Sequence, residues 1–112
     1  MDSTRQHKIS RLLQRDMAEL VQLNSKSWFG GIMVTVSGVK ITSDLSIAKI
    51  YVSIFPAKDK KQIIDILEKN GSYLRLELGK RIKNQLRIVP ALRFYIDDSL
   101  DYVENIDKIL KP

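Results

Sequence analysis

The chain has 112 residues, 44% of them hydrophobic, and a formal net charge of +6 from 19 Lys and Arg against 13 Asp and Glu. This length allows one hydrophobic core, so we expect a single folded domain over residues 1–112 and no second domain. The absence of cysteine excludes thiol catalysis, zinc fingers and a disulfide framework. A positive balance favours a polyanionic partner, although it also serves solubility.

The first helix is predicted from about Ser3 to Asn24, with Ser3 and Gln6 forming a capping box. Its apolar residues recur three and four positions apart and form one stripe: Ile9, Leu12, Leu13, Met17, Leu20 and Val21. Lys8, Arg11 and Arg15 share the opposite side, within roughly 60° of one another at 100° per residue. That side is either a solvated charged face or a nucleic-acid contact.

The same cations interrupt any continuous apolar run near the start of the chain. Neither a signal peptide nor a membrane span is predicted there. We therefore expect a cytoplasmic protein with no membrane contact.

A loop is predicted from Asn24 to Gly31, where Trp28 and Phe29 precede two glycines. An aromatic plug that closes the core is favoured there over stacking on nucleic-acid bases.

Two strands are predicted next, joined by a turn at Thr42–Asp44. In the first, the apolar positions change phase around Ser37 and Gly38, which indicates a β-bulge. In the second, Ala48, Ile50, Val52 and Ile54 alternate with a polar-aromatic set: Lys49, Tyr51, Ser53 and Phe55. This strand is therefore expected to bury one face.

Helical character then runs from Asp59, which fits a cap with Gln62, to about Leu86. A straight helix of this length would be about 42 Å long, against a radius of gyration near 13 Å for a domain of this size. We therefore predict a break at three weak helix formers, namely Asn70, Gly71 and Ser72.

The segment from Asn70 to Arg93 contains six positive residues and one negative residue, Glu77. Leu74, Leu78, Ile82 and Leu86 are expected to face the core, which leaves the basic positions outward or at the border. A glycine at position 79 destabilises a helix interior by about 1 kcal/mol relative to alanine. Either tight packing or close approach of a phosphate backbone would explain it, and both remain open.

A third strand alternates from Leu92 to Ile96, and a weak amphipathic helix is expected from about Ser99 to Leu110. The predicted class is α+β, in the order helix, strand, strand, helix, kink, helix, strand and short C-terminal helix. A three-stranded sheet covered on one face by helices is the economical packing. The strand order stays open.

Motifs for catalysis are scarce. His7 is the only histidine and lies in a basic N-terminal region, and no phosphate-binding glycine loop is present. Asp97, Asp98 and Asp101 suit a helix N-terminus better than a metal site. We expect no enzyme, no cofactor and no metal.

Six co-linear runs extend over nearly the whole chain: Ile9–Leu20, Val34–Val52, Tyr73–Arg75, Leu78–Lys80, Leu86–Phe94 and Asp97–Leu100. Together these runs resemble the ribosome-binding factor A family. The resemblance implies a type II KH fold and a bacterial factor that binds the free small (30S) ribosomal subunit and its 16S rRNA. It also implies a role in late maturation and in processing of the rRNA 5′ end. The family carries an Ala-x-Gly kink, whereas here the glycine is shifted by one place, to Gly71.

We hypothesise a non-catalytic, monomeric protein that docks on structured ribosomal RNA by phosphate contacts. The candidate RNA-binding residues are Arg75, Lys80, Arg81, Lys83 and Arg87, with Lys8, Arg11 and Arg15 as a second group. An assembly GTPase is a further candidate partner. The main rival is a protein–protein adaptor that uses the exposed sheet face of Tyr51, Phe55 and Tyr95, and a second is a peripheral membrane binder.

Overall fold

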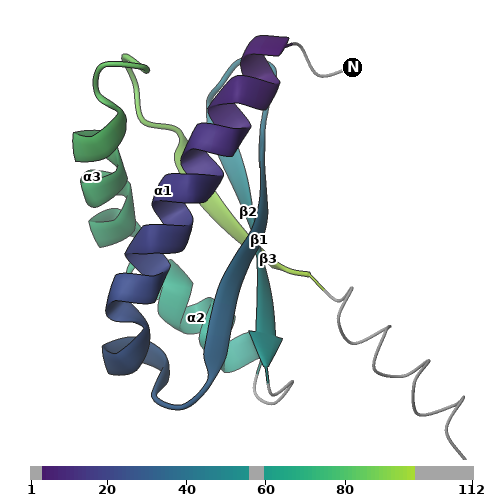
Figure 1. Ribbon diagram of the computed structural model, residues 1–112, viewed down its shortest axis with the longest axis vertical. Helices are drawn as coiled ribbons and strands as arrows, with labels where there is room; N and C mark the ends of the chain where they lie inside the picture. The colour runs from purple at the N-terminus through teal and green to yellow at the C-terminus, as the bar shows by residue number, and fades with distance from the viewer. Residues whose placement is uncertain (1–3, 56–59, 98–112) are drawn as a thin grey trace, which may run out of the picture.

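The computed structural model describes residues 4–55 and 60–97. Its elements are α1 (Thr4–Phe29), β1 (Met33–Ile41), β2 (Ile47–Phe55), α2 (Lys60–Lys69), α3 (Gly71–Ile82) and β3 (Ala91–Ile96) (Figure 1). This confirms the predicted α+β order up to the third strand. The predicted caps at Ser3 and Asp59 and the predicted helix from Ser99 lie outside the described residues.

The sheet has the strand order β1-β2-β3, with β2 in the centre. The β1 and β2 strands are antiparallel, whereas β2 and β3 are parallel, so that Ile50 lies opposite both Val39 and Phe94. Parallel neighbours need a crossover connection. Here α2 and α3 together supply that connection.

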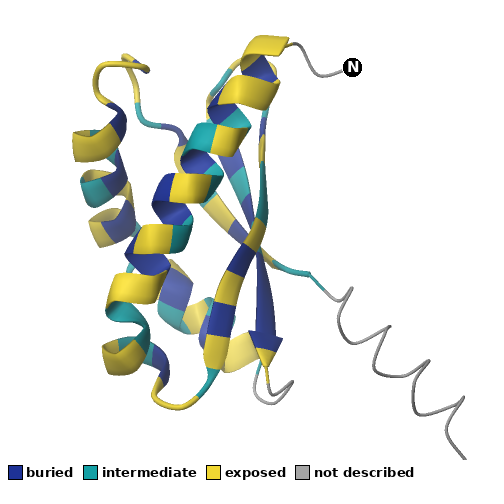
Figure 2. Cartoon of the chain, viewed as in Figure 1, coloured by how far each residue is buried: buried dark blue, intermediate teal, exposed yellow. Residues whose placement is uncertain are grey.

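All three described helices lie on one side of the sheet (Figure 1). Along β2, the side chains of Ala48, Ile50, Val52 and Ile54 are buried against the helices, as the predicted alternation requires. Buried positions likewise follow one stripe of α1 and one stripe of α3 (Figure 2). The prediction of a sheet covered on one face is therefore confirmed.

The α1 helix is longer than predicted, because it continues through residues 24–29, where a loop was expected. Phe29 is only 5% exposed, and the Trp28 ring lies edge-on to Tyr73 of α3 with ring centroids 5.9 Å apart. These contacts outweigh the weak helix propensity of Asn24, Ser25 and Ser27. The helix ends at Phe29, and Gly30 follows with a φ of 61°, which is typical of a residue just after a helix C-terminus. Phe29 therefore closes the core, as expected for the predicted aromatic plug.

The β-bulge is confirmed, since the β1–β2 register shifts between Val36 and Gly38. The turn between these strands is stabilised by Asp44. Its carboxylate accepts hydrogen bonds from Ser46 Oγ at 2.7 Å, Thr42 Oγ1 at 2.8 Å and Ser46 N at 3.1 Å. These bonds, with the Ser46 hydroxyl foremost, lower the pKa of the Asp44 carboxyl group.

The helix break is also confirmed, because α2 ends at Lys69 and α3 begins at Gly71. Both the backbone N and the side-chain Nδ2 of Asn70 donate to Ile66 O, at 3.1 and 2.8 Å. The α3 helix ends at Ile82 rather than near Leu86, and a turn follows in which Gln85 N donates to Ile82 O. Leu86 is nevertheless buried, as predicted.

Candidate nucleic-acid interface

The outer surface of α3 follows from its buried stripe. Leu74, Leu78 and Ile82 are fully buried, so the residues between them lie outward or at the borders of the helix. On that surface is a hollow of about 680 Å³, lined by Ser72, Arg75, Leu76, Gly79, Lys80, Lys83 and Val89. Three of the predicted RNA-binding residues, Arg75, Lys80 and Lys83, therefore share one concave site. We call this site the α3 hollow.

Arg75 holds the wall of the α3 hollow. Its Nη2 donates to Val89 O at 2.7 Å and its Nε donates to Pro90 O at 3.2 Å. These two bonds fix the segment 83–90, which returns the chain from α3 to β3. Because a guanidinium has five N–H donors, Arg75 can still donate to a ligand in the hollow.

Lys80 and Lys83 differ in their surroundings. Lys80 Nζ lies 2.8 Å from Glu77 Oε2, and this hydrogen bond and the charge of Glu77 raise the pKa of Lys80. Lys80 is therefore fully charged at neutral pH. Lys83 is exposed and forms no ion pair within the part of the chain that the structure describes. Lys83 is thus the cation of the hollow most readily available to an anion.

Gly79 packs against the segment 83–90 that returns the chain from α3 to β3, here called the return segment. A Cβ at this position would lie 2.9 Å from Val89 Cγ2, closer than side chains normally approach. Of the two explanations that the sequence left open, the structure supports tight packing.

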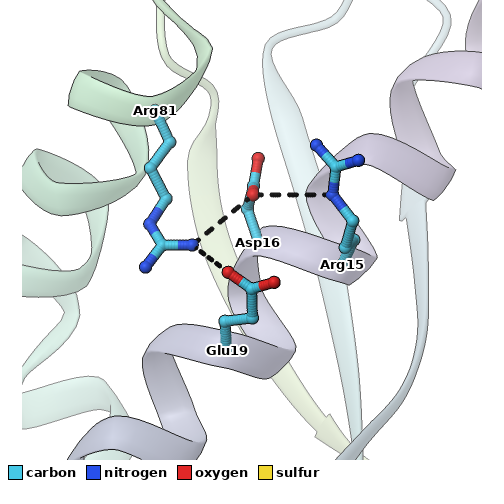
Figure 3. A network of polar contacts seen from close by, with 4 residues as sticks. All are labelled: Arg15, Asp16, Glu19 and Arg81. Atoms are coloured by element: carbon cyan, nitrogen blue, oxygen red, sulfur yellow. Dashed lines mark hydrogen bonds and ion pairs between the residues drawn. The ribbon is translucent and has the colours of Figure 1, made fainter.

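Arg81 is not among the residues that line the α3 hollow; it bridges α3 to α1 instead (Figure 3). Its Nη1 lies 3.6 Å from Asp16 Oδ1 and also hydrogen-bonds to Glu19 Oε2. Arg15 Nε lies 3.8 Å from the same oxygen of Asp16, on the other side. Asp16 is only 5% exposed, so these cations compensate a nearly buried negative charge. Two acids therefore neutralise Arg81, which the sequence grouped with the phosphate contacts.

The remaining predicted residues lie elsewhere. Arg87 lines a separate hollow with Arg5, beside the β1–β2 turn. Lys8, Arg11 and Arg15 are exposed on α1, opposite its buried stripe. The structure thus divides the predicted set into the α3 hollow, the Arg81 bridge, the Arg87 hollow and the α1 face.

Sequence reasoning missed two basic features. Arg5 was not assigned to a site, although it lies beside Arg87. Lys40, Lys49 and Arg93 are direct partners across the three strands. The alternation of each strand places these three residues on the face away from the core. Only the strand order, which the sequence left open, brings them together.

Among residues 4–55 and 60–97, no group of three or more His, Cys, Asp or Glu side chains is placed to hold a metal ion. No helix in these ranges is long and apolar enough to cross a membrane.

A helix, an antiparallel strand pair, two helices joined at a break and a strand parallel to the second strand define a KH-like domain of type II. The sequence profile of "Ribosome-binding factor A" matches residues 5–110. The chain is also 46% identical over 112 residues to ribosome-binding factor A of Christiangramia forsetii, covering 98% of this chain and 85% of that protein. The chain belongs to the ribosome-binding factor A family.

Two structural matches support the fold. The crystal structure of ribosome-binding factor A from Thermus thermophilus gives a TM-score of 0.71 at 23% identity, covering 81% of this chain and 94% of that one. A homology model of the Thermus thermophilus factor, fitted into a cryo-EM map of a 30S–RbfA complex, gives a TM-score of 0.64 at 24% identity. That match covers 80% of this chain and 91% of the other.

The contact between Gly79 and Val89 predicts a dependence between the two positions. Gly79→Ala should gain about 1 kcal/mol of helix propensity but lose about 1–3 kcal/mol to overpacking. In the native background we expect a lower free energy of unfolding, measured by urea denaturation. In a Val89→Ala background, the same substitution should be stabilising, because the clash is removed. An equal effect in both backgrounds would contradict the packing contact.

The Arg81 bridge predicts a structural role. Arg81→Met should lower the free energy of unfolding by about 1–2 kcal/mol, because it leaves Asp16 and Glu19 poorly compensated. Lys83→Met, at an exposed position of the same region, is the control and should change stability by less than about 0.5 kcal/mol. If Arg81→Met were as stable as the native protein, the Arg81 bridge would not contribute to the stability of the fold.

Proposed function

We propose that this protein binds the small ribosomal subunit through its ribosomal RNA and supports late maturation of that subunit without catalysing a reaction itself. The observation that carries the proposal is the α3 hollow, in which Arg75, Lys80 and Lys83 surround one concave surface. Membership of the ribosome-binding factor A family and the 30S complex of the Thermus thermophilus relative support the choice of partner.

The geometry of the α3 hollow suits a protein that recognises the sugar-phosphate backbone of RNA. Lysine and arginine contacts to phosphates fix position and orientation without reading base sequence. Double-stranded RNA is recognised mainly by shape and by its sugar-phosphate backbone. Selectivity would then come from the three-dimensional RNA surface of an immature subunit, which presents phosphates where the α3 hollow and the α1 face can both reach them.

The α1 face is a natural second contact. Lys8, Arg11 and Arg15 follow one line of the helix over about 10 Å at 1.5 Å per residue. The α1 and α3 helices are neighbours, joined by the Arg81 bridge (Figure 3). The bridge also neutralises Asp16 and Glu19, which would otherwise repel phosphates between the two cationic areas.

The proposal includes processing of the 5′ end of 16S rRNA as the step that the bound factor assists. We further propose that the protein is a cytoplasmic monomer and that residues 1–112 form its single domain. The candidate partner for its release from the subunit is an assembly GTPase. These points rest on the family resemblance together with the charge distribution.

The first test reverses charge in the α3 hollow. The variant with Lys80→Glu and Lys83→Glu should no longer co-sediment with free 30S subunits in a sucrose gradient, because both cations would become repulsive to phosphate. Its free energy of unfolding should fall by about 1 kcal/mol at most, because both sites are exposed and the main loss is the ion pair between Lys80 and Glu77. In cells that depend on this protein, the variant should accumulate 16S precursor with an unprocessed 5′ end.

The matched control carries Lys61→Glu and Lys69→Glu, two exposed lysines of α2 outside the hollow, with the same change in net charge. This control should still bind. If both variants lost 30S binding equally, the effect would come from overall charge and not from the α3 hollow. If the Lys80/Lys83 variant still bound, the α3 hollow would not be part of the interface.

The second test measures salt dependence. If roughly five phosphates are neutralised, the logarithm of the association constant should fall with the logarithm of salt concentration at a slope of about −3.5 to −4.5. A neutral variant, Lys80→Gln with Lys83→Gln, should make the slope shallower by about 1.4–1.8, because two phosphate contacts are lost. A native slope near zero, measured by filter binding to 30S subunits, would contradict phosphate recognition.

A further inference from the structure

The face of the sheet that points away from the helices, here called the open face, carries an organised set of side chains. Lys40 of β1, Lys49 of β2 and Arg93 of β3 are aligned across the strands as direct Cα partners. Lys40 and Arg93 are exposed and Lys49 is half-buried. We call these three residues the basic row.

The next row on the open face is aromatic. Tyr51 and Tyr95 are partners across β2 and β3, and their rings stack with centroids 5.6 Å apart and an angle of 30° between the planes. Their neighbour on β1 is Gly38, where an added Cβ would meet no atom within 4 Å. The two rings therefore form a stacked aromatic pair with open space on the β1 side, and Tyr95 is 43% exposed.

The two rows have the spacing of neighbouring positions on one face of a strand. Lys49 and Tyr51, like Arg93 and Tyr95, are two residues apart, which is about 6.6 Å at 3.3 Å per residue. Cations beside aromatic rings are typical of protein surfaces that bind single-stranded nucleic acid, because the cations contact phosphates while the bases stack on the rings.

The basic row places three like charges side by side. Like charges directly opposite one another on a sheet are destabilising. Within the described ranges, none of the three forms an ion pair, and Glu68, which lines a hollow with Arg93, lies beyond ion-pair distance of it. A partner that supplies negative charge would relieve the repulsion within the row.

We propose that the open face is a second RNA-binding surface, specific for single-stranded RNA, on which bases stack on Tyr51 and Tyr95 and phosphates contact the basic row. Unpaired bases can stack on exposed aromatic rings, whereas bases within a duplex are already stacked on one another. The helices cover the opposite side of the sheet, so this surface and the α3 hollow do not overlap (Figure 1). The proposal extends the proposed function and does not depend on subunit binding.

The competing occupant of the open face is a protein. Met33 and Phe55, partners on β1 and β2, are 64% and 51% exposed and form an apolar pair at the other end of this face. An apolar partner surface would bury the uncompensated basic row at a high desolvation cost. RNA is favoured because it supplies both the charge and the stacking groups.

The test uses the full chain and a fluorescein-labelled eight-nucleotide single-stranded RNA, with an eight-base-pair duplex of the same sequence for comparison. Fluorescence anisotropy, measured in a Lys80→Gln, Lys83→Gln background so that the α3 hollow contributes little, should show binding of the single strand in preference to the duplex. Tyr95→Ala should weaken it by about 5- to 150-fold, the usual effect of losing one base stack, whereas Tyr95→Phe should retain it. Lys49→Gln with Arg93→Gln should weaken binding and lower its salt dependence, whereas Lys61→Gln should not.

A mapping experiment keeps the test decisive even if a variant fails to fold. In ¹⁵N-labelled native protein, the single strand should shift the amide signals of Lys40, Lys49, Tyr51, Arg93 and Tyr95. Shifts confined to α1 or α3, equal shifts of the open-face amides by the single strand and by the duplex, or no binding at millimolar RNA would overturn the proposal. So would a concentration-dependent dimer or an RNA-independent protein complex that protects the open face. Because the probe is a short oligonucleotide, this result is separate from 30S co-sedimentation.

Discussion

The arrangement of the whole domain depends on one constraint, which is that the helical connection from β2 to β3 must turn back on itself to pack on the covered side of the sheet. The break at Asn70 satisfies this constraint, because α2 and α3 can then both pack on the same face while the chain returns to β3. The crossover places β3 parallel to β2 and leaves the outer surface of α3 facing solvent. The α3 hollow and the open face both follow from this connection.

Basic residues in this protein have two kinds of role. Arg81 compensates the nearly buried Asp16, and Arg75 fixes the return segment through two carbonyl groups, so both support the fold. Lys83 and the α1 cations make few such contacts and are available to a partner. Arg75 belongs to both groups, since it also lines the hollow that it helps to shape.

The elements could largely be predicted from sequence because their signals are local. Alternation identified β2, the phase change identified the bulge, and three weak helix formers identified the break at Asn70. The extension of α1 to Phe29 could not be predicted, because it depends on contacts with α3 and the core. The separation of Arg81 from Lys80 also escaped prediction: the two are adjacent in sequence, yet their partners lie on different elements. The basic row required the strand order, which no local pattern contains.

The one-sided covering of the sheet has a geometric consequence. RNA bound outside the helices and RNA bound on the bare side are separated by at least the diameter of a helix, about 10–12 Å. The sheet and the helices would stand between two such strands, so these strands could not form base pairs with each other there. With both proposed surfaces occupied, a domain of this shape would act as a spacer that keeps two lengths of RNA from annealing until it leaves.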